Sequence, residues 1–133
     1  MQKGDDFLLE QDYIVRLIKE MIRTILKLLF HIDTDTPTAE LLSEAHEREI
    51  LDHLLDLIDD GNINEAENEV YELISDGNAN AFEIALLFYS YLNDKTDDFL
   101  KENDFSREEI QEGLKNIVSE CGLSSLADIF LTE

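Results

Sequence analysis

The sequence predicts an all-α protein, a six- to seven-helix array with orthogonal or antiparallel packing. Three observations carry this prediction. The 133 residues include one proline and five glycines, so few positions are bound to interrupt a helix. Apolar residues recur at helical spacing, and β-branched residues nowhere alternate with polar ones over the length of a strand. The hydrophobic content of 44% suffices for the core of one domain.

Residues 1–11 are expected to form a loose leader, and residues 12–133 a single helical domain. The first helix is expected over 12–32, because twelve of the nineteen residues from Ile14 to Ile32 are apolar. Four of the chain's ten bases lie within this run: Arg16, Lys19, Arg23 and Lys27. At 100° per residue they fall within about 80° of one another, and the apolar residues fill about 220° of the helix.

The second helix is expected over 37–59, after the proline that stops the first one. Its apolar side changes direction between Ala45 and Ile50. Either this helix is broken near Glu47, or it contacts different neighbours along its length, and the second interpretation is preferred.

Two similar turns, "DGNIN" and "DGNAN", end helices and start new ones, since glycine accepts a positive φ and asparagine caps a helix. The elements expected around and after them span 65–75, 82–92, 96–102, 105–122 and, as a final short helix, 124–131. The segment 82–92 is apolar on nearly all sides and is therefore expected to be buried. Ser106 and Glu109 have the spacing of a capping box.

The charge is strongly negative and unevenly distributed. The net charge is −22. Residues 1–32 hold five acids and five bases, so residues 33–133 carry all of the excess. We therefore expect no direct binding of nucleic acid, which needs clustered bases, and no attraction to an anionic membrane.

The first helix is not expected to cross a membrane, because a base recurs every three or four residues through its middle. Cys121 is the only cysteine and cannot form an internal disulfide, and no signal peptide is visible. The expected compartment is the cytoplasm.

Few residues are candidates for a metal-binding or catalytic site. His46, Glu49 and His53 would share one face of a continuous second helix and are candidate ligands for a divalent metal. The two imidazoles lie two turns apart, about 10 Å along the axis, so a solvated polar stripe is the preferred interpretation. The asparagine-rich turns lack the glycine and the glutamate of a calcium loop. No catalytic motif is recognised in the sequence, and no cofactor is expected.

One segment resembles a known repeat. In "DGNINEAENEVYELI", Gly61 precedes the small residue Ala66 by five positions, and Val70 and Leu73 follow. This pattern is similar to the second helix of a tetratricopeptide repeat. The resemblance implies a tetratricopeptide-like helical hairpin, and no second copy keeps the spacing that a solenoid would need.

A broader resemblance covers most of the chain. It rests on four blocks in order: "QDYIVRLIKEMIR", "GNINEAENEVYELI", "FYSYLN" and "NDFSREEIQEGLKNI". They resemble an uncharacterised family of short, acidic, helical bacterial proteins. The resemblance implies that the basic first helix is a regular part of such proteins, and it carries over no activity and no site residue.

The leading functional hypothesis is a non-catalytic interaction or scaffold module that forms a homodimer through its first helix, because a large exposed apolar patch marks an interface. The apolar candidates for this interface are Ile14, Leu17, Ile18, Met21, Ile22, Ile25 and Leu29, with Arg16, Lys19, Arg23 and Lys27 at its edge facing acidic helices. In the competing interpretation this helix lies in its own chain's core, with its bases extended to water. Two further alternatives are an acidic regulator that imitates nucleic-acid charge and binds a basic partner protein, and a metal-dependent hydrolase.

Overall fold

The computed structural model describes the backbone of residues 3–34 and 41–123, and the side chains of these residues from Asp12 onward. This part of the chain forms six helices and no strand, which confirms the all-α class. The helices are α1 (Lys3–Phe30), α2 (Ala45–Asp59), α3 (Ile63–Ser75), α4 (Ala81–Asn93), α5 (Asp97–Glu102) and α6 (Arg107–Glu120). The final helix expected over 124–131 lies outside the described residues.

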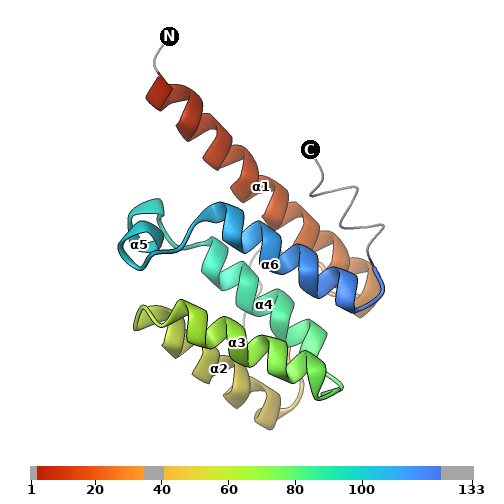
Figure 1. Ribbon diagram of the computed structural model, residues 1–133. Coiled ribbons are helices and arrows are strands. Elements are labelled where there is room, and N and C mark those ends of the chain that lie inside the picture. The colour runs from red at the N-terminus through yellow and green to blue at the C-terminus, as the bar shows by residue number, and fades with distance from the viewer. Residues whose placement is uncertain (1–2, 35–40, 124–133) are drawn as a thin grey trace.

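Helix α4 lies at the centre of the fold. Nine of its thirteen residues are buried, as its uniformly apolar sequence predicts. It contacts α1, α2, α3 and α6. In Figure 1, α1 and α6 lie on one side of α4, and the pair α2 and α3 lies on the other. The molecule is therefore a stack of helices in which α4 separates the first helix from the α2–α3 pair.

Helix α1 begins at Lys3, nine residues before the expected start, so most of the predicted leader is helical. Nothing in residues 3–11 stops a helix, since that segment contains no proline. The N-terminal turns of α1 extend past the other helices (Figure 1). The helix ends at Phe30, where His31 adopts a positive φ of 60° and the Ile32 amide bonds the Leu26 carbonyl at 3.0 Å. This is the left-handed geometry of a helix C-terminus.

Helix α2 begins at Ala45, so the continuous helix preferred for 37–59 is wrong. Leu41 and Leu42 precede the helix, and Leu42 is buried. Its carbonyl accepts a hydrogen bond of 2.7 Å from the Arg48 guanidinium, which fixes the entry of the chain into α2. The apolar side changes direction because residues before Ala45 do not follow the helical period of those after it.

Helices α2 and α3 form the expected antiparallel hairpin and lie side by side (Figure 1). Gly61 in the turn has a φ of 87°, a conformation that L side chains rarely adopt. Ala66 and Val70 are fully buried, whereas Leu73 is half-buried. Two of the three apolar positions in the tetratricopeptide-like pattern thus lie in the core.

Arg107 links the end of α4 to the start of α6. Its side chain is buried and donates to the carbonyls of Asn93 and Lys95, at 2.7 and 2.6 Å. It also contacts the Asp97 carboxylate at 3.0 Å. At the same end, Ser106 accepts from the Glu109 amide at 3.1 Å, which confirms the predicted cap. Together these contacts set the direction in which α6 returns along α4 and α1.

Candidate functional site

The apolar side of α1 faces the core of its own chain. Ile18, Met21, Ile22 and Ile25 are at most 1% exposed, because α1 packs against α4 and α6. These four residues cannot contact a second subunit while the chain is folded, so their assignment to an interface is wrong. For this side of the helix the competing interpretation, burial in its own core, is correct.

Three large hydrophobic side chains of α1 remain exposed. Tyr13 is 58% exposed, Leu28 59% and Leu29 46%, and these are the exposed large hydrophobic residues of the described chain. All three lie on α1. Ile14 and Leu17 are half-buried at the margin of the core. Of the predicted apolar interface, Ile14, Leu17 and Leu29 thus keep surface that a partner can reach.

Arg16, Lys19, Arg23 and Lys27 form an exposed row on the side of α1 that faces away from the core, which we call the basic ridge. Arg23 and Lys27 contact the Asp33 carboxylate at 3.7 and 3.8 Å, and both pairs are exposed to water. Exposed pairs of this kind contribute about 0–1 kcal/mol each. The two ion pairs with Asp33 can therefore be broken at little cost.

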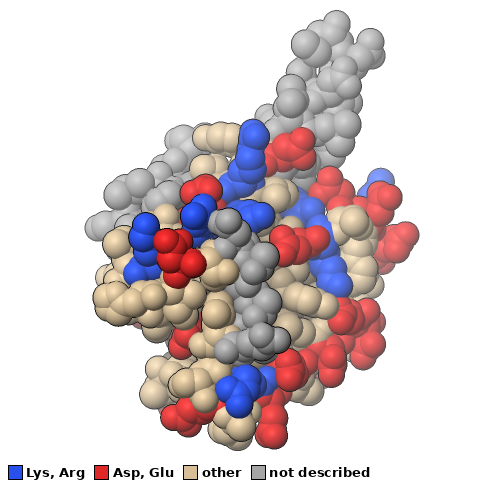
Figure 2. Space-filling view, turned by 180° about the vertical axis from the view of Figure 1, so that it is seen from behind, with Lys and Arg blue, Asp and Glu red and all other residues tan. Residues whose placement is uncertain are grey.

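Two bases outside α1, Arg48 and Lys95, have partners in the folded chain. Arg48 binds the Leu42 carbonyl. Lys95 contacts Asp59 at 2.6 Å and lies over the rings of Tyr91 and Phe99. Burial alone would raise the pKa of Asp59, but hydrogen bonds from Lys95 and Tyr91 outweigh it and lower that pKa. Figure 2 shows most Lys and Arg atoms in the upper part of the rear face and Asp and Glu atoms along its lower right edge.

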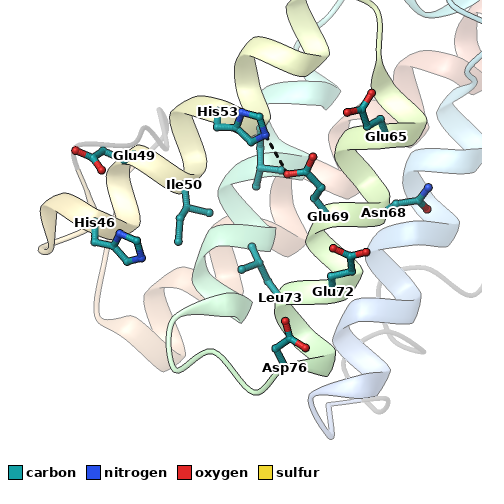
Figure 3. A pocket seen from close by; sticks show the side chains of 11 residues that line it. His46, Glu49, Ile50, His53, Glu65, Asn68, Glu69, Glu72, Leu73 and Asp76 are labelled. Atoms are coloured by element: carbon teal, nitrogen blue, oxygen red, sulfur yellow. Dashed lines mark hydrogen bonds and ion pairs between the residues drawn. The ribbon is translucent and has the colours of Figure 1, made fainter.

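A groove of about 660 Å³ lies between α2 and α3. Its apolar floor is made by Ile50 and Leu54 of α2 and Leu73 of α3. No Lys or Arg lines it. The α3 wall carries four carboxylates, which we call the acidic row: Glu65, Glu69, Glu72 and Asp76. Figure 3 shows these side chains along one wall of the groove, opposite those of α2.

The candidate metal ligands lie on the α2 wall of this groove. His53 contacts Glu69 across it, at 3.0 Å between Nε2 and Oε1. His46 and Glu49 lie further along the wall toward the start of α2 (Figure 3). The described chain has no group of three or more His, Cys, Asp or Glu side chains placed to hold a metal ion. Thus His46, Glu49 and His53 are not brought together around one point.

The sequence interpretation missed the acidic row. A signal for it was present, because its members follow one another at intervals of four, three and four residues, the spacing of one helix face. The row was hidden by the abundance of acids in residues 33–133, where many such spacings arise.

Two other polar features serve the fold. The Tyr89 hydroxyl donates to Glu67 at 2.6 Å beside Gly113, where α6 crosses α3 and α4. Burial raises the pKa of both side chains, so Glu67 is held in a poorly solvated place. A second hollow, about 740 Å³, lies over α5 and the start of α6, but its Arg107 is occupied by main-chain carbonyls.

Cys121 is half-buried at the end of α6. Burial, with the nearby charge of Glu120, raises the pKa of its thiol. A thiol with a raised pKa is a poor nucleophile at neutral pH. This agrees with a structural role for the cysteine.

Fold and surface together define an all-helical protein with an exposed basic first helix and an acid-walled groove. A family model described as a family of unknown function (DUF6483) matches residues 8–122, and the chain belongs to this family. No curated protein and no solved structure matches the chain. Within the described residues, no helix has both the length and the apolar character that a membrane crossing requires.

Proposed function

We propose that this protein is a non-catalytic helical interaction module that self-associates through the exposed side of α1. One observation carries the proposal: Tyr13, Leu28 and Leu29 are exposed, and all belong to the helix that also bears the basic ridge. Exposed aromatic and leucine side chains beside bases are typical of contact surfaces. The compartment in this proposal is the cytoplasm, where Cys121 stays reduced.

The proposed interface is smaller than the whole apolar side of α1. Its apolar part consists of Tyr13 and Leu28 with the accessible edges of Ile14 and Leu17, and of Leu29 at the C-terminal end of α1, on the core side of the helix. An interface of this size and polarity favours reversible association over an obligate dimer. The exposed bases would set orientation and the rate of encounter more than the affinity.

A second candidate is an acidic regulator that binds a basic partner protein. The groove between α2 and α3 favours it, because five carboxylates and no base line an apolar floor: Glu49 and the acidic row. Titration with a basic amphipathic peptide, at low and high salt, tests this candidate. Tight binding that salt abolishes supports it, and absence of binding contradicts it.

The test of self-association is the mass of the full-length protein by light scattering after gel filtration, over a series of concentrations and at low, intermediate and high salt. The expected mass exceeds that of one chain and rises with concentration. A single-chain mass under all conditions would contradict the proposal.

The α1 surface is tested by the double variant Arg16→Glu/Lys19→Glu, which is expected to lose the association. Its matched control is Lys101→Glu/Lys115→Glu, which changes the net charge equally at bases outside α1. The control should associate like the wild type. Equal association of both variants would show that the basic ridge takes no part. Circular dichroism confirms that each variant remains helical.

A further inference from the structure

We propose that the surface which receives α1 is the α2–α3 groove of a second copy of this chain, with the basic ridge facing the acidic row. This inference rests on the proposed self-association and names its counterpart surface. It replaces a contact between two α1 helices by a contact between two different surfaces.

The two rows match in length and number. The basic ridge runs from Arg16 to Lys27, and the acidic row from Glu65 to Asp76. Each row has four charges over twelve residues, that is eleven steps of 1.5 Å or about 16 Å. Both lie on straight helices, α1 and α3. When α1 lies along the groove, each base can therefore approach a carboxylate.

Charge is complementary between the facing parts of the two surfaces as well. Residues 12–30 of α1 hold four bases and two acids, a net charge of +2. The groove is lined by five carboxylates and no base, a net charge of −5 with neutral histidines. Complementary potentials of this kind orient the partners and suppress wrong pairings.

Apolar side chains accompany the charges on both surfaces. At 100° per residue Tyr13, Leu17 and Leu28 lie within about 60° of one another, along one side of the basic ridge. The groove offers the half-buried Ile50 and Leu73 between its walls. Contact between these side chains removes apolar surface from water, which supplies the affinity that exposed ion pairs alone do not.

A single chain cannot make this contact with itself. Helix α1 contacts α4 from one side, and α2 and α3 contact α4 from the other (Figure 1). The ridge and the groove therefore belong to opposite sides of the same molecule. A second copy is required, and repetition of the contact is head-to-tail, which forms an open chain or a closed ring.

Net repulsion between two molecules of charge −22 opposes any association at low salt. At physiological ionic strength the screening length is about 8 Å. Charges far from the contact are then screened, whereas rows in direct contact still attract. The contact is thus expected to be strongest at intermediate salt.

The test uses the groove variant Glu72→Lys/Asp76→Lys in the full-length chain. Both side chains are exposed near the C-terminal end of α3, where bases suit the helix dipole, so the fold should persist. The expected dissociation constant for self-association rises by about tenfold or more, because attraction becomes repulsion. The matched control, Glu102→Lys/Glu120→Lys, makes the same charge change at the ends of α5 and α6 and should associate like the wild type.

The decisive experiment mixes the two charge-reversed variants. The groove variant and the ridge variant Arg16→Glu/Lys19→Glu should each remain single chains, and their equimolar mixture should associate, because each reversed surface meets its complement. Wild-type affinity in the groove variant, or no association in the mixture, overturns this inference while the proposed self-association stands. A wild-type mass that stops at two chains overturns the head-to-tail contact. If the wild-type protein has the mass of a single chain, the proposed self-association itself is contradicted.

Discussion

Replacing Arg107 by methionine should lower the free energy of unfolding by about 3–5 kcal/mol. The buried guanidinium donates to two main-chain carbonyls, of Asn93 and Lys95, at 2.7 and 2.6 Å. Methionine fills similar space but donates nothing, so both carbonyls lose their partner. A buried polar group left unsatisfied costs about 1–3 kcal/mol.

The ion pair with Asp97 adds little to this figure. That carboxylate is 48% exposed, so water replaces its partner, and the loss is at most about 1 kcal/mol. Removing the buried charge returns part of the cost, because the guanidinium no longer has to be desolvated. The estimate of about 3–5 kcal/mol therefore rests mainly on the two carbonyls, and it is a large share of a typical domain's stability of about 5–15 kcal/mol.

The assay is equilibrium unfolding in urea, followed by far-ultraviolet circular dichroism at a concentration where the protein is a single chain. With a denaturant slope of about 2 kcal/mol per molar, the midpoint should fall by roughly 2 M. Asp97→Asn is the matched control and should cost no more than about 1 kcal/mol. A loss below about 1 kcal/mol in Arg107→Met, or equal losses in the two variants, would refute the argument.

Three further outcomes follow from buried side chains. Burial raises the pKa of Glu67 in the folded state, so the stability gained by protonating this side chain is complete below about pH 4.5 and is lost as pH rises through the folded pKa. The rise in melting temperature from pH 7 to pH 4.5 should therefore be smaller in Glu67→Gln than in the wild type, and equal rises would contradict this assignment. In Gly113→Ala the new methyl group would collide with the Tyr89 hydroxyl and the Glu67 carboxylate. Thermal melting should show a net loss of about 1–3 kcal/mol in the free energy of unfolding, although alanine is the better helix former. A stabilised variant would contradict the close approach of Gly113 to these two side chains. Glu47 is buried, and its Oε2 has no hydrogen-bond partner among the described residues. Glu47→Gln should therefore unfold in urea at the wild-type midpoint or above it. A decrease of more than about 1 kcal/mol in the free energy of unfolding would instead show that this oxygen has a partner.

The central helix and the turns of the fold could be predicted from the sequence because their causes are local. The segment 82–92 has no polar side to present to water, so burial is its only stable place. Gly61 and Gly77 both adopt positive φ, as their turns require. The asparagine caps predicted for the same turns are wrong, because the side chains of Asn62 and Asn80 accept no hydrogen bond from the first turn of the helix that follows. The pair Ser106 and Glu109 forms its cap within four residues. In each case the signal and the structure lie within one or two helical turns.

The role of α1 depended on tertiary structure and could be predicted only in part. Helical periodicity correctly separated an apolar side from a basic one. It could not show that α4 and α6 cover Ile18 and Met21, since that depends on residues about 65 to 100 positions away. Exposure of the basic side followed from the pattern, whereas the number of helices available to cover the apolar side did not.

Arg107 carried a sequence signal that only the structure explains. A base in the first turn of a helix opposes the helix dipole, and local preference would place an acid there. Such a local conflict indicates a residue retained for a distant contact. The carbonyls that it binds lie at the end of α4, beyond the reach of pattern analysis.

The central position of α4 has a consequence for how the molecule opens. Every other long helix packs against α4, so its amide groups cannot reach water unless both the α1–α6 side and the α2–α3 side have separated. Hydrogen exchange in α4 should therefore require unfolding of the whole chain, whereas amides at the projecting end of α1 exchange by local fraying. The two surfaces that we propose to meet between copies are thus joined, within each copy, through the helix that we expect to exchange most slowly.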